Sequence, residues 1–349
     1  METNHNLVIS DTHFGSHQNS LTWNQYLLQF FEKQFIPYLK HLKDTSKNPI
    51  NLIHTGDVYD SRTSLNPNII QHTHDLFKQL TQYVDNFYIL SGNHDHYYNE
   101  NPHPCNINLT LSHISNKIKI FSGDQIYMEF LNNNEVGIFI PWFGLSNEKN
   151  LLKIKNIISQ VDTPNTIFKV FCHTNLGEYS YNAILKYLSG FPKDKLMVYS
   201  GHMHNPNLSV PLPKNFINLG SVFYFNFNDT TDRFFYNLTT GETILNTTTP
   251  RYYNISSIET LNNRLSILKT SDYINLYITP ESLEKNYKKI KELRKKYPNM
   301  NIIPNSFEEN SYDNYEHNLQ QFSKQNMLQY ITQYIPTHLQ DLYKSFLID

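Results

Sequence analysis

The sequence has few cysteines, little net charge and no long apolar segment. Only Cys105 and Cys172 occur among the 349 residues, and two such distant cysteines exclude a disulfide framework and a thiolate zinc site. The formal net charge of −2 argues against a general polyanion binder, so any affinity for nucleic acid must come from local basic patches or metal ions. No run of about 18 apolar residues occurs, and the first residues lack the features of a secretion signal. We therefore expect a soluble, cytoplasmic protein that contacts no membrane.

Short segments rich in β-branched and aromatic residues are present instead, and they are typical of buried strands. They cover residues 7–10, 50–55, 87–91, 136–140, 167–172 and 196–200. Between them, residues 21–42 and 69–84 carry apolar side chains at helical spacing. Strands that alternate with helices predict a layered α/β domain whose sheets are covered by helices.

The pattern changes after residue 250, and we expect three regions: 1–250, 251–304 and 305–349. In the second region, a strand over Tyr273–Ile278 leads into a helix that reaches Lys296, with Thr279 as N-cap and Pro280 in the first helical position. The third region begins with a polar, acidic linker over residues 305–318. It ends with two apolar helical stripes on either side of Pro336, namely Phe322, Met327, Leu328, Ile331 and Ile335, then Leu339, Leu342, Tyr343 and Phe346.

Five polar motifs each follow a predicted strand directly. They contain Asp11 and His13; Gly56, Asp57 and Asp60; Gly92, Asn93, His94 and Asp95; His173; and Gly201, His202 and His204. Each motif alone is common in turns, but ligands collect at the carboxyl ends of strands in α/β sheets, so five such ends can aim at one place. Oxygen and imidazole donors suit Mn, Fe, Zn or Mg. Seven of these side chains can hold two ions about 3.5 to 4 Å apart, as in-line phosphoryl displacement uses them.

In this order the motifs resemble those of the calcineurin-like metallophosphoesterase family, over residues 7–225. Three extensions are similar to the SbcD-type double-strand-break-repair nucleases, which include the phage exonuclease subunit 1: Phe14-Gly15, Ser91 before Gly92, and Asn218–Ser221. The resemblance implies a layered β-sandwich flanked by helices over residues 1–250. It also implies a small α+β capping domain over residues 251–304 and a C-terminal helical hairpin within residues 305–349.

The resemblance also implies a dimetal ligand set. It assigns the first metal to Asp11, His13, Asp57 and His204, and the second to Asn93, His173 and His202, with Asp57 as the bridge. Both ions are expected to be Mn, with Mg as the alternative, and a hydroxide that bridges them is expected to attack phosphorus.

Two further side chains are expected to act in catalysis. His94 resembles the family's non-ligand histidine, which protonates the leaving oxygen or stabilises the charged phosphorane. Asp60 stands where many of the nucleases have histidine and phosphatases of the superfamily have aspartate. We expect it to orient His94, against the alternative of a turn-capping aspartate. Asp95 is left without a catalytic role, because an aspartate after Asn-His also caps loops.

DNA contacts are expected near the motifs and on the capping domain. Arg62 can hold a phosphate and Tyr97 can stack on a base, although an ordinary exposed loop explains both equally well. Lys288, Lys289 and Lys295 lie on the polar face of the helix over residues 281–297, which is either a solvated face or, by the resemblance, a face for duplex DNA.

The C-terminal hairpin either packs on the chain's own body or docks on another protein. The resemblance favours docking on the coiled coil of an SMC-like ATPase, with a homodimer of this chain inside a heterotetramer. In that setting we expect a phage protein in the host cytoplasm, acting in DNA recombination, repair and replication.

Three functions are compatible with the sequence. The leading one is a metal-dependent double-strand DNA exonuclease and single-strand endonuclease, the nuclease subunit of an SbcCD-like complex. The second is a dimetal phosphomonoesterase or nucleotide phosphodiesterase with an unrelated tail, and the third is a non-catalytic DNA-end tether. The intact ligand set with His94 argues against the tether. The lysine-rich helix and the C-terminal region argue against the small-molecule phosphatase.

Overall fold

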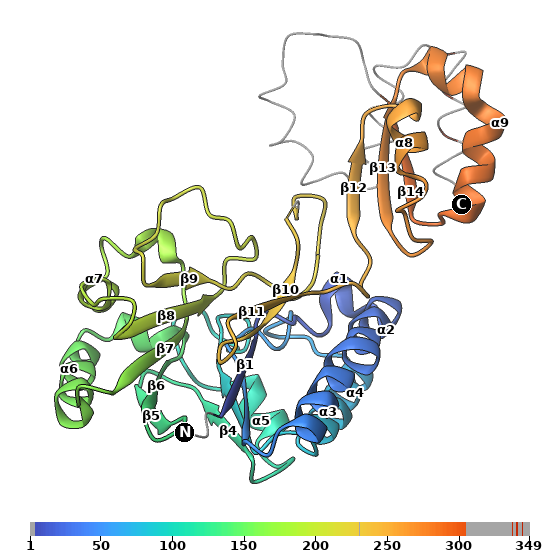
Figure 1. Cartoon of the computed structure of the whole chain (residues 1–349). Helices are drawn as coiled ribbons and strands as arrows, with labels where there is room; N and C mark the ends of the chain where they lie inside the picture. The colour runs from blue at the N-terminus through green and yellow to red at the C-terminus, as the bar shows by residue number, and fades with distance from the viewer. Residues whose placement is uncertain (1–3, 230, 305–336, 338–339, 341–343, 345–349) are drawn as a thin grey trace. The chain divides into compact units, whose positions relative to one another are not determined.

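The computed structural model (Figure 1) describes residues 4–229, 231–304, 337, 340 and 344. The chain forms two compact units: the first contains the residues up to Phe225 and then Asp229–Thr249, and the second contains Asn226–Asn228 and the chain from Pro250. Three residues, 226–228, thus leave the first unit to join the second before the chain returns. The predicted linker over residues 305–318 and the two apolar stripes of the C-terminal hairpin lie outside the described residues.

A six-stranded sheet in the order β11-β10-β1-β2-β3-β4 forms the first layer of unit 1. Its parallel strands are β1 (His5–Ile9), β2 (Ile50–His54), β3 (Asn86–Leu90) and β4 (Ile118–Phe121). At one edge, β10 (Phe234–Asn237) and β11 (Glu242–Leu245) continue the sheet in antiparallel pairing. The three strands predicted in this part of the sequence are confirmed as β1, β2 and β3.

A five-stranded sheet in the order β5-β6-β7-β8-β9 forms the second layer. Its strands are β5 (Tyr127–Phe130), β6 (Glu135–Ile140), β7 (Ile167–His173), β8 (Leu196–Gly201) and β9 (Phe216–Asn218). All neighbours pair in parallel except β5, which is antiparallel to β6. The predicted strands over residues 136–140, 167–172 and 196–200 are confirmed as β6, β7 and β8.

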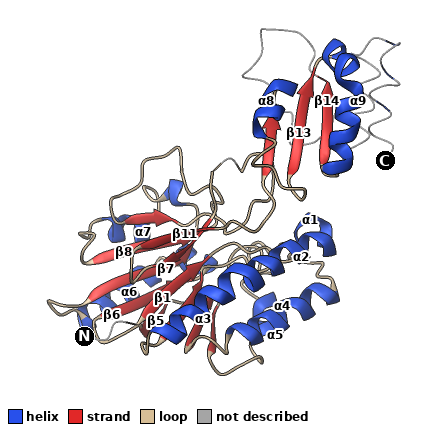
Figure 2. Cartoon of the chain, turned by 45° about the vertical axis from the view of Figure 1, so that its right-hand side comes forward, coloured by secondary structure: helices blue, strands red, loops and turns tan. Residues whose placement is uncertain are grey.

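The two sheets face each other across an apolar core. Val8, Ile53 and Leu90 from the first sheet pack in one cluster with Phe139 and Phe171 from the second. Helices cover the outer faces (Figure 2). These helices are α2 (Leu21–Phe30), α3 (Ile36–Thr45), α4 (Pro67–Leu80), α5 (Asn106–Leu111), α6 (Lys149–Val161) and α7 (Ala183–Ser189). The short segment α1 (Ser16–Asn19) before them is a turn in which His17, Gln18 and Asn19 have left-handed backbone angles. The predicted layered α/β sandwich is therefore confirmed. In the described part of the chain, no helix has the length and apolar character needed to span a bilayer.

The helical segment predicted over residues 21–42 is not one regular helix. It contains α2, a π-helical turn over Phe31–Phe35 and then α3. Pro37 lies in the first turn of α3 and lacks the N–H that a continuous α-helix requires, so the hydrogen-bond ladder is interrupted there. The widened turn buries Phe30, Phe31 and Phe35 completely.

Unit 2 is a small fold in which three parallel strands alternate with two helices, and both helices share one apolar core with the sheet. It is therefore an α/β arrangement rather than the α+β domain that the resemblance implied. Its parallel sheet has the order β12-β13-β14, with β12 (Tyr252–Ile255), β13 (Tyr273–Ile278) and β14 (Met300–Pro304). Helices α8 (Ile258–Arg264) and α9 (Pro280–Lys296) pack on it. The predicted cap of α9 is confirmed, because the Thr279 hydroxyl accepts a hydrogen bond from the Ser282 N–H at 3.3 Å.

Candidate metal centre

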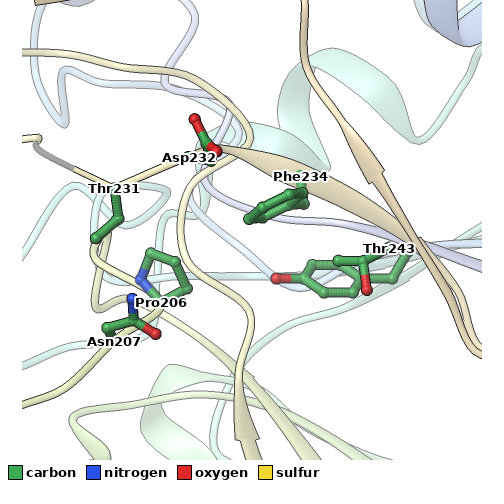
Figure 3. Close-up of a pocket in the computed structure, with 7 residues that line it drawn as sticks. Pro206, Asn207, Thr231, Asp232, Phe234 and Thr243 are labelled. Carbon is green, nitrogen blue, oxygen red and sulfur yellow. The ribbon is translucent and has the colours of Figure 1, made fainter.

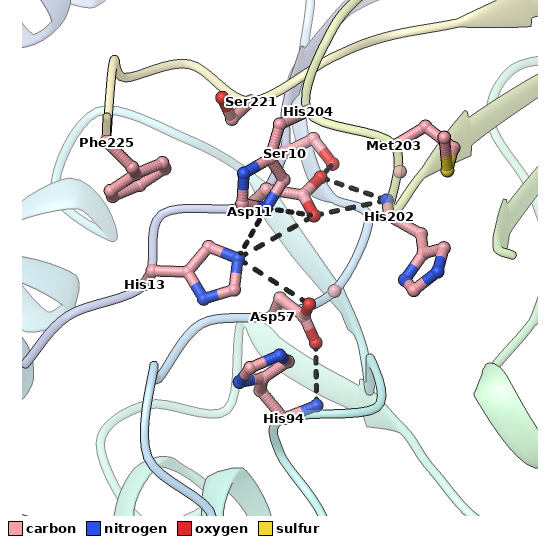
Figure 4. A network of polar contacts seen from close by, with 12 residues as sticks. Ser10, Asp11, His13, Asp57, His94, His202, Met203, His204, Ser221 and Phe225 are labelled. Atoms are coloured by element: carbon pink, nitrogen blue, oxygen red, sulfur yellow. Dashed lines mark hydrogen bonds and ion pairs between the residues drawn. The ribbon is translucent and has the colours of Figure 1, made fainter. Parts of the chain in front are cut away.

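The carboxyl ends of five parallel strands carry the predicted ligands. Asp11, Asp57 and Asn93 follow β1, β2 and β3, while His173 ends β7 and His202 follows β8. His13 and His204 lie two residues further along the first and last of these loops. Because both sheets end their strands at the same edge, all seven side chains converge on one centre, much of which is drawn in Figure 4.

One group of donor atoms comes from Asp11, His13 and His204, whose ligand atoms lie within 4.8 Å of one another. The Nε2 atoms of His13 and His204 are 2.9 Å apart. Each of these nitrogens lies 3.9 Å from Oδ1 of Asp11. The group has the carboxylate and imidazole donors expected for the first metal.

A second group comes from Asp57, His173 and His202, with Asn93 between the two imidazoles. Oδ1 of Asn93 lies 3.1 Å from Nε2 of His173 and 3.0 Å from Nδ1 of His202. If the oxygen and nitrogen of the Asn93 amide were exchanged, the nitrogen would face both rings and donate a hydrogen bond to each of them. The orientation with the oxygen toward the imidazoles is the one that suits a divalent cation, so this donor set fits a metal.

Asp57 lies between the two groups. Its Oδ2 is 3.6 Å from Nε2 of His13 and 3.2 Å from Nε2 of His173. Burial opposes ionisation of this carboxyl, but the neighbouring His173 keeps its pKa well below the usual range. An ionised carboxylate in this position is suited to bridge two cations.

The imidazoles of the centre differ in protonation. Burial and then the adjacent His13 lower the pKa of His204 to about 2, and burial with His173 lowers that of His202 to about 4. Both rings are neutral at pH 7, which is the form that donates a lone pair to a metal. Burial lowers the pKa of His173 as well, but Asp57 outweighs it and raises the value to about 9. The carboxylates therefore favour positive charge at this position.

Seven non-glycine residues in the described part of the chain have a positive φ, and four of them are candidate ligands; the other three are His17, Gln18 and Asn19. Asp11, His13, Asp57 and His202 have φ values of 51°, 44°, 56° and 90°, in the left-handed region that non-glycine residues rarely adopt. Two motif glycines allow the close approach of the loops. A Cβ on Gly56 would lie 2.5 Å from Nδ1 of His173, and one on Gly92 would overlap with Oδ1 of Asp57. Strain of this kind is characteristic of functional sites.

His94 stands beside these groups and is held by the loop of Asp60. Its N–H donates to Oδ1 of Asp57 at 2.8 Å, and its ring lies 4.9 Å from that of His13 in an edge-on arrangement. Nδ1 of His94 donates to the backbone carbonyl of Asp60. The Asp60 carboxylate faces Nδ1 of His13 instead, at 3.3 Å. The contact expected between Asp60 and His94 is thus made by the main chain, because the side chain points to a predicted ligand.

Asp95, which the sequence left without a role, ties two loops of the centre together. It is fully buried, and its carboxylate accepts hydrogen bonds from the N–H groups of Gly92, Asp57, Val58 and Tyr59 at 2.8 to 3.2 Å. The loop after β2 and the loop after β3 are therefore held on one carboxylate. Spacing within one motif could not reveal partners that are about 40 residues away in the sequence.

Two aromatic side chains that belong to no motif flank the histidines. Trp142, in the 3-10 turn Trp142–Ser146 after β6, lies 5.0 Å from the ring of His202. Phe225 lies 5.2 Å from the ring of His13 and 5.3 Å from that of His204. No sequence signal distinguished these two residues from ordinary core aromatics.

The residues predicted to contact DNA lie in different places. With the Asn93 oxygen toward the imidazoles, the amide nitrogen of Asn93 lies 3.1 Å from Nη2 of Arg62. Both groups are donors and make no hydrogen bond to each other in this orientation, so the guanidinium lies beside the centre. Tyr97 is exposed beside Tyr98 on the loop after the His94 motif. Lys288, Lys289 and Lys295 are exposed on α9 of unit 2.

A separate hollow of about 460 Å³ begins two residues beyond His204 (Figure 3). It is lined by Pro206, Asn207, Thr231, Asp232, Phe234, Tyr236 and Thr243. None of the predicted ligands lines it, so it is distinct from the metal centre.

Comparison with known proteins agrees with the geometry. The sequence model described as calcineurin-like phosphoesterase matches residues 6–206, which contain all five motifs. No curated protein matches the chain.

Proposed function

Because the chain belongs to the calcineurin-like phosphoesterase family and is therefore a metal-dependent phosphoesterase, we propose that its substrate is the phosphodiester backbone of DNA. The proposed activity is that of an SbcD-type nuclease, which degrades duplex DNA from its ends and cuts single strands internally. The observation that carries the choice of DNA over a small ester is the exposed lysine face of α9.

The candidate ligands fit divalent ions in two groups. Asp11, His13 and His204 would hold one ion, Asn93, His173 and His202 the other, and Asp57 both. When bound, such ions neutralise the phosphate and lower the pKa of coordinated water. We propose Mn²⁺ as the native metal, with Mg²⁺ as the alternative, because the donors are carboxylate, amide and imidazole.

The remaining groups act on the leaving side of the phosphate. Nδ1 of His94 carries a hydrogen that it donates to the Asp60 carbonyl, so Nε2 is the atom that exchanges a proton with the leaving oxygen. Arg62, 3.1 Å from the Asn93 amide, supplies a second donor for a non-bridging phosphate oxygen. Trp142 and Phe225 flank the imidazoles with apolar surface, which limits the access of water to the donors.

The lysines of α9 support a polyanionic substrate. Leu283, Ile290 and Tyr297 are buried against the small sheet, and the opposite face exposes Lys288, Lys289 and Lys295. With a net charge of −2 for the whole chain, this cluster is a local basic patch on a near-neutral protein. A phosphatase for small esters needs no such patch. A nuclease that acts on duplex DNA can use it to bind the regular array of phosphates.

We further propose that residues 305–349 dock on the coiled coil of an SMC-like ATPase. The support is the pair of apolar helical stripes in the sequence around Pro336. A chain truncated after residue 304 should retain nuclease activity and lose co-purification with the ATPase. If the truncated chain still co-purified with the ATPase, this docking would be excluded.

The nuclease proposal is tested by substrate comparison. Purified protein with Mn²⁺ is incubated with linear duplex DNA, single-stranded circles and para-nitrophenyl phosphate. We expect hydrolysis of both DNA substrates and only slow turnover of the small ester. Hydrolysis of the small ester alone would favour the phosphomonoesterase, and binding of DNA without hydrolysis would favour the tether.

A further inference from the structure

The turn that carries His202 and His204 is held by its backbone carbonyls. The Asn218 amide donates to the carbonyls of Met203 and Asn205, at 3.0 and 2.6 Å. The carbonyl of His204 accepts two hydrogen bonds, from the Ser221 N–H at 3.0 Å and from Nη1 of Arg233 at 2.5 Å. Because the direction of a side chain follows from its backbone, these bonds fix where the His204 ring points.

Arg233 reaches this carbonyl from a fully buried position. Its exposed fraction is 0 %, and its Nη2 pairs with Oδ1 of Asp229 at 2.5 Å. The guanidinium also lies over the ring of Tyr224, 5.4 Å from its centre. A buried ion pair is often no more stabilising than apolar residues of the same volume, so fold stability alone does not account for an arginine here.

The partner of Arg233 holds a second element of the centre. Oδ2 of Asp229 accepts a hydrogen bond from the N–H of Phe225 at 2.5 Å. The Phe225 ring contacts His13 and His204, as Figure 4 shows. The Asp229–Arg233 pair therefore holds two parts of the centre. Arg233 holds the backbone of His204, and Asp229 holds the backbone of Phe225, whose ring packs on His13 and His204.

We propose that Arg233, with Asp229 as its counter-ion, is a positioning residue for His204 at the first metal. It belongs to neither group of candidate ligands, and it acts by holding the His204 carbonyl. The proposal rests on the divalent-metal centre and is independent of whether the substrate is DNA.

A matched control exists in the same unit. Lys169 is another buried cation, 5 % exposed, and its Nζ pairs with Oε1 of the half-buried Glu135 at 2.6 Å. Lys169 precedes His173 by four residues on β7, which separates them by about 13 Å at about 3.3 Å per residue. Replacing Lys169 by methionine removes a buried cation without touching the centre.

The test is a titration of the metal-free, full-length protein with Mn²⁺ by calorimetry. The wild type is expected to bind two ions, and Arg233→Met to bind one of them about 10 to 100 times more weakly, the usual effect of removing a group that orients a ligand. Arg233→Lys, which keeps a donor for the carbonyl, should recover part of the loss. Lys169→Met should bind both ions as the wild type does, even if its melting temperature falls as far as that of Arg233→Met.

A second variant shows which ion is affected. His204→Ala removes a ligand of the first metal, so adding Arg233→Met to it should weaken Mn²⁺ binding no further. Additive losses, wild-type affinities in Arg233→Met, or an equal loss in Lys169→Met would overturn the proposal. If Arg233→Met does not fold, wild-type affinities in Arg233→Lys and Asp229→Asn would overturn it. A wild type that binds no Mn²⁺ would contradict the metal centre itself.

Discussion

Oδ1 of Asp60 lies 3.3 Å from Nδ1 of His13, the ring nitrogen opposite the one that faces Asp11 and His204. A carboxylate in this place orients the imidazole and raises the basicity of the other nitrogen. We predict that Asp60→Asn raises the Mn²⁺ concentration for half-maximal activity about 10-fold. The rate at saturating Mn²⁺ should fall little, because the contact with His94 is made by the backbone carbonyl, which the substitution keeps. A rate that stays low at every Mn²⁺ concentration would show that the carboxylate acts on His94.

His94→Ala should lower the rate and leave Mn²⁺ binding unchanged, which is the opposite of the effect expected for Asp60→Asn. General acid–base catalysis contributes about 100- to 10,000-fold, and we expect a loss of rate in this range at saturating Mn²⁺. The number of ions bound should stay at that of the wild type, since the hydrogen bond from His94 to Asp57 is donated by the backbone N–H, which the substitution keeps. Steady-state rates on duplex DNA and calorimetric titration measure the two quantities. Wild-type turnover in the variant would exclude the proposed role.

Part of this site could be predicted from the sequence, because continuous apolar segments identify buried strands and the motifs follow them directly. Parallel strands then bring Asp11, Asp57 and Asn93 to one edge whatever the details of packing. The short strands β9, β10 and β11 have three or four residues each and carry too few side chains for a pattern. Nor does any local sequence pattern predict that residues 226–228 belong to the second unit.

The roles that the sequence could not give are those defined by distant partners. Arg233 is an ordinary arginine until its contact with the His204 carbonyl is known, 29 residues away. Asp60 illustrates a second limit. One residue contacts His94 with its main chain and His13 with its side chain, and spacing alone cannot distinguish the two.

Asp95→Asn should destabilise the first unit. An amide has one oxygen, so its nitrogen would face N–H groups that now donate to a carboxylate. We expect a loss of about 1 to 3 kcal/mol in the free energy of unfolding, because at least one buried N–H group would lose its acceptor. Denaturant titration measures it, with Asp85→Asn as control, since that carboxylate accepts from the single N–H of Ile50 and is exposed. Equal losses in the two variants would contradict the role of Asp95 as the tie between two loops.

Gly92→Ala should abolish metal binding. The added Cβ would overlap with the Asp57 carboxylate and its backbone N–H, and the strained loop after β2 cannot yield without moving Asp57. Gly241→Ala is the control, because Gly241 has a φ of +75° but open space around it, so the alanine incurs only the conformational cost of about 1 to 2 kcal/mol. Calorimetry should detect no Mn²⁺ binding in Gly92→Ala and both ions in Gly241→Ala. Two ions in both variants would show that Asp57 has more freedom than its surroundings indicate.

Replacing Lys288, Lys289 and Lys295 by alanine should weaken DNA binding without altering the chemistry of the site. Each phosphate contact adds about 0.9 to the slope of log K against log salt concentration, so the slope should fall by up to about 2.7. All three side chains are exposed on α9, and the core of unit 2 should not change.

The matched control replaces Lys149, Lys153 and Lys155, which are exposed on α6 of unit 1. Both triple variants carry the same change in net charge, so a general electrostatic effect would lower the slope equally in both. A fall confined to the α9 variant, with unchanged hydrolysis of para-nitrophenyl phosphate, would assign the duplex to this face. Equal slopes in the two variants would leave α9 as a solvated surface and remove the main support for DNA over a small ester.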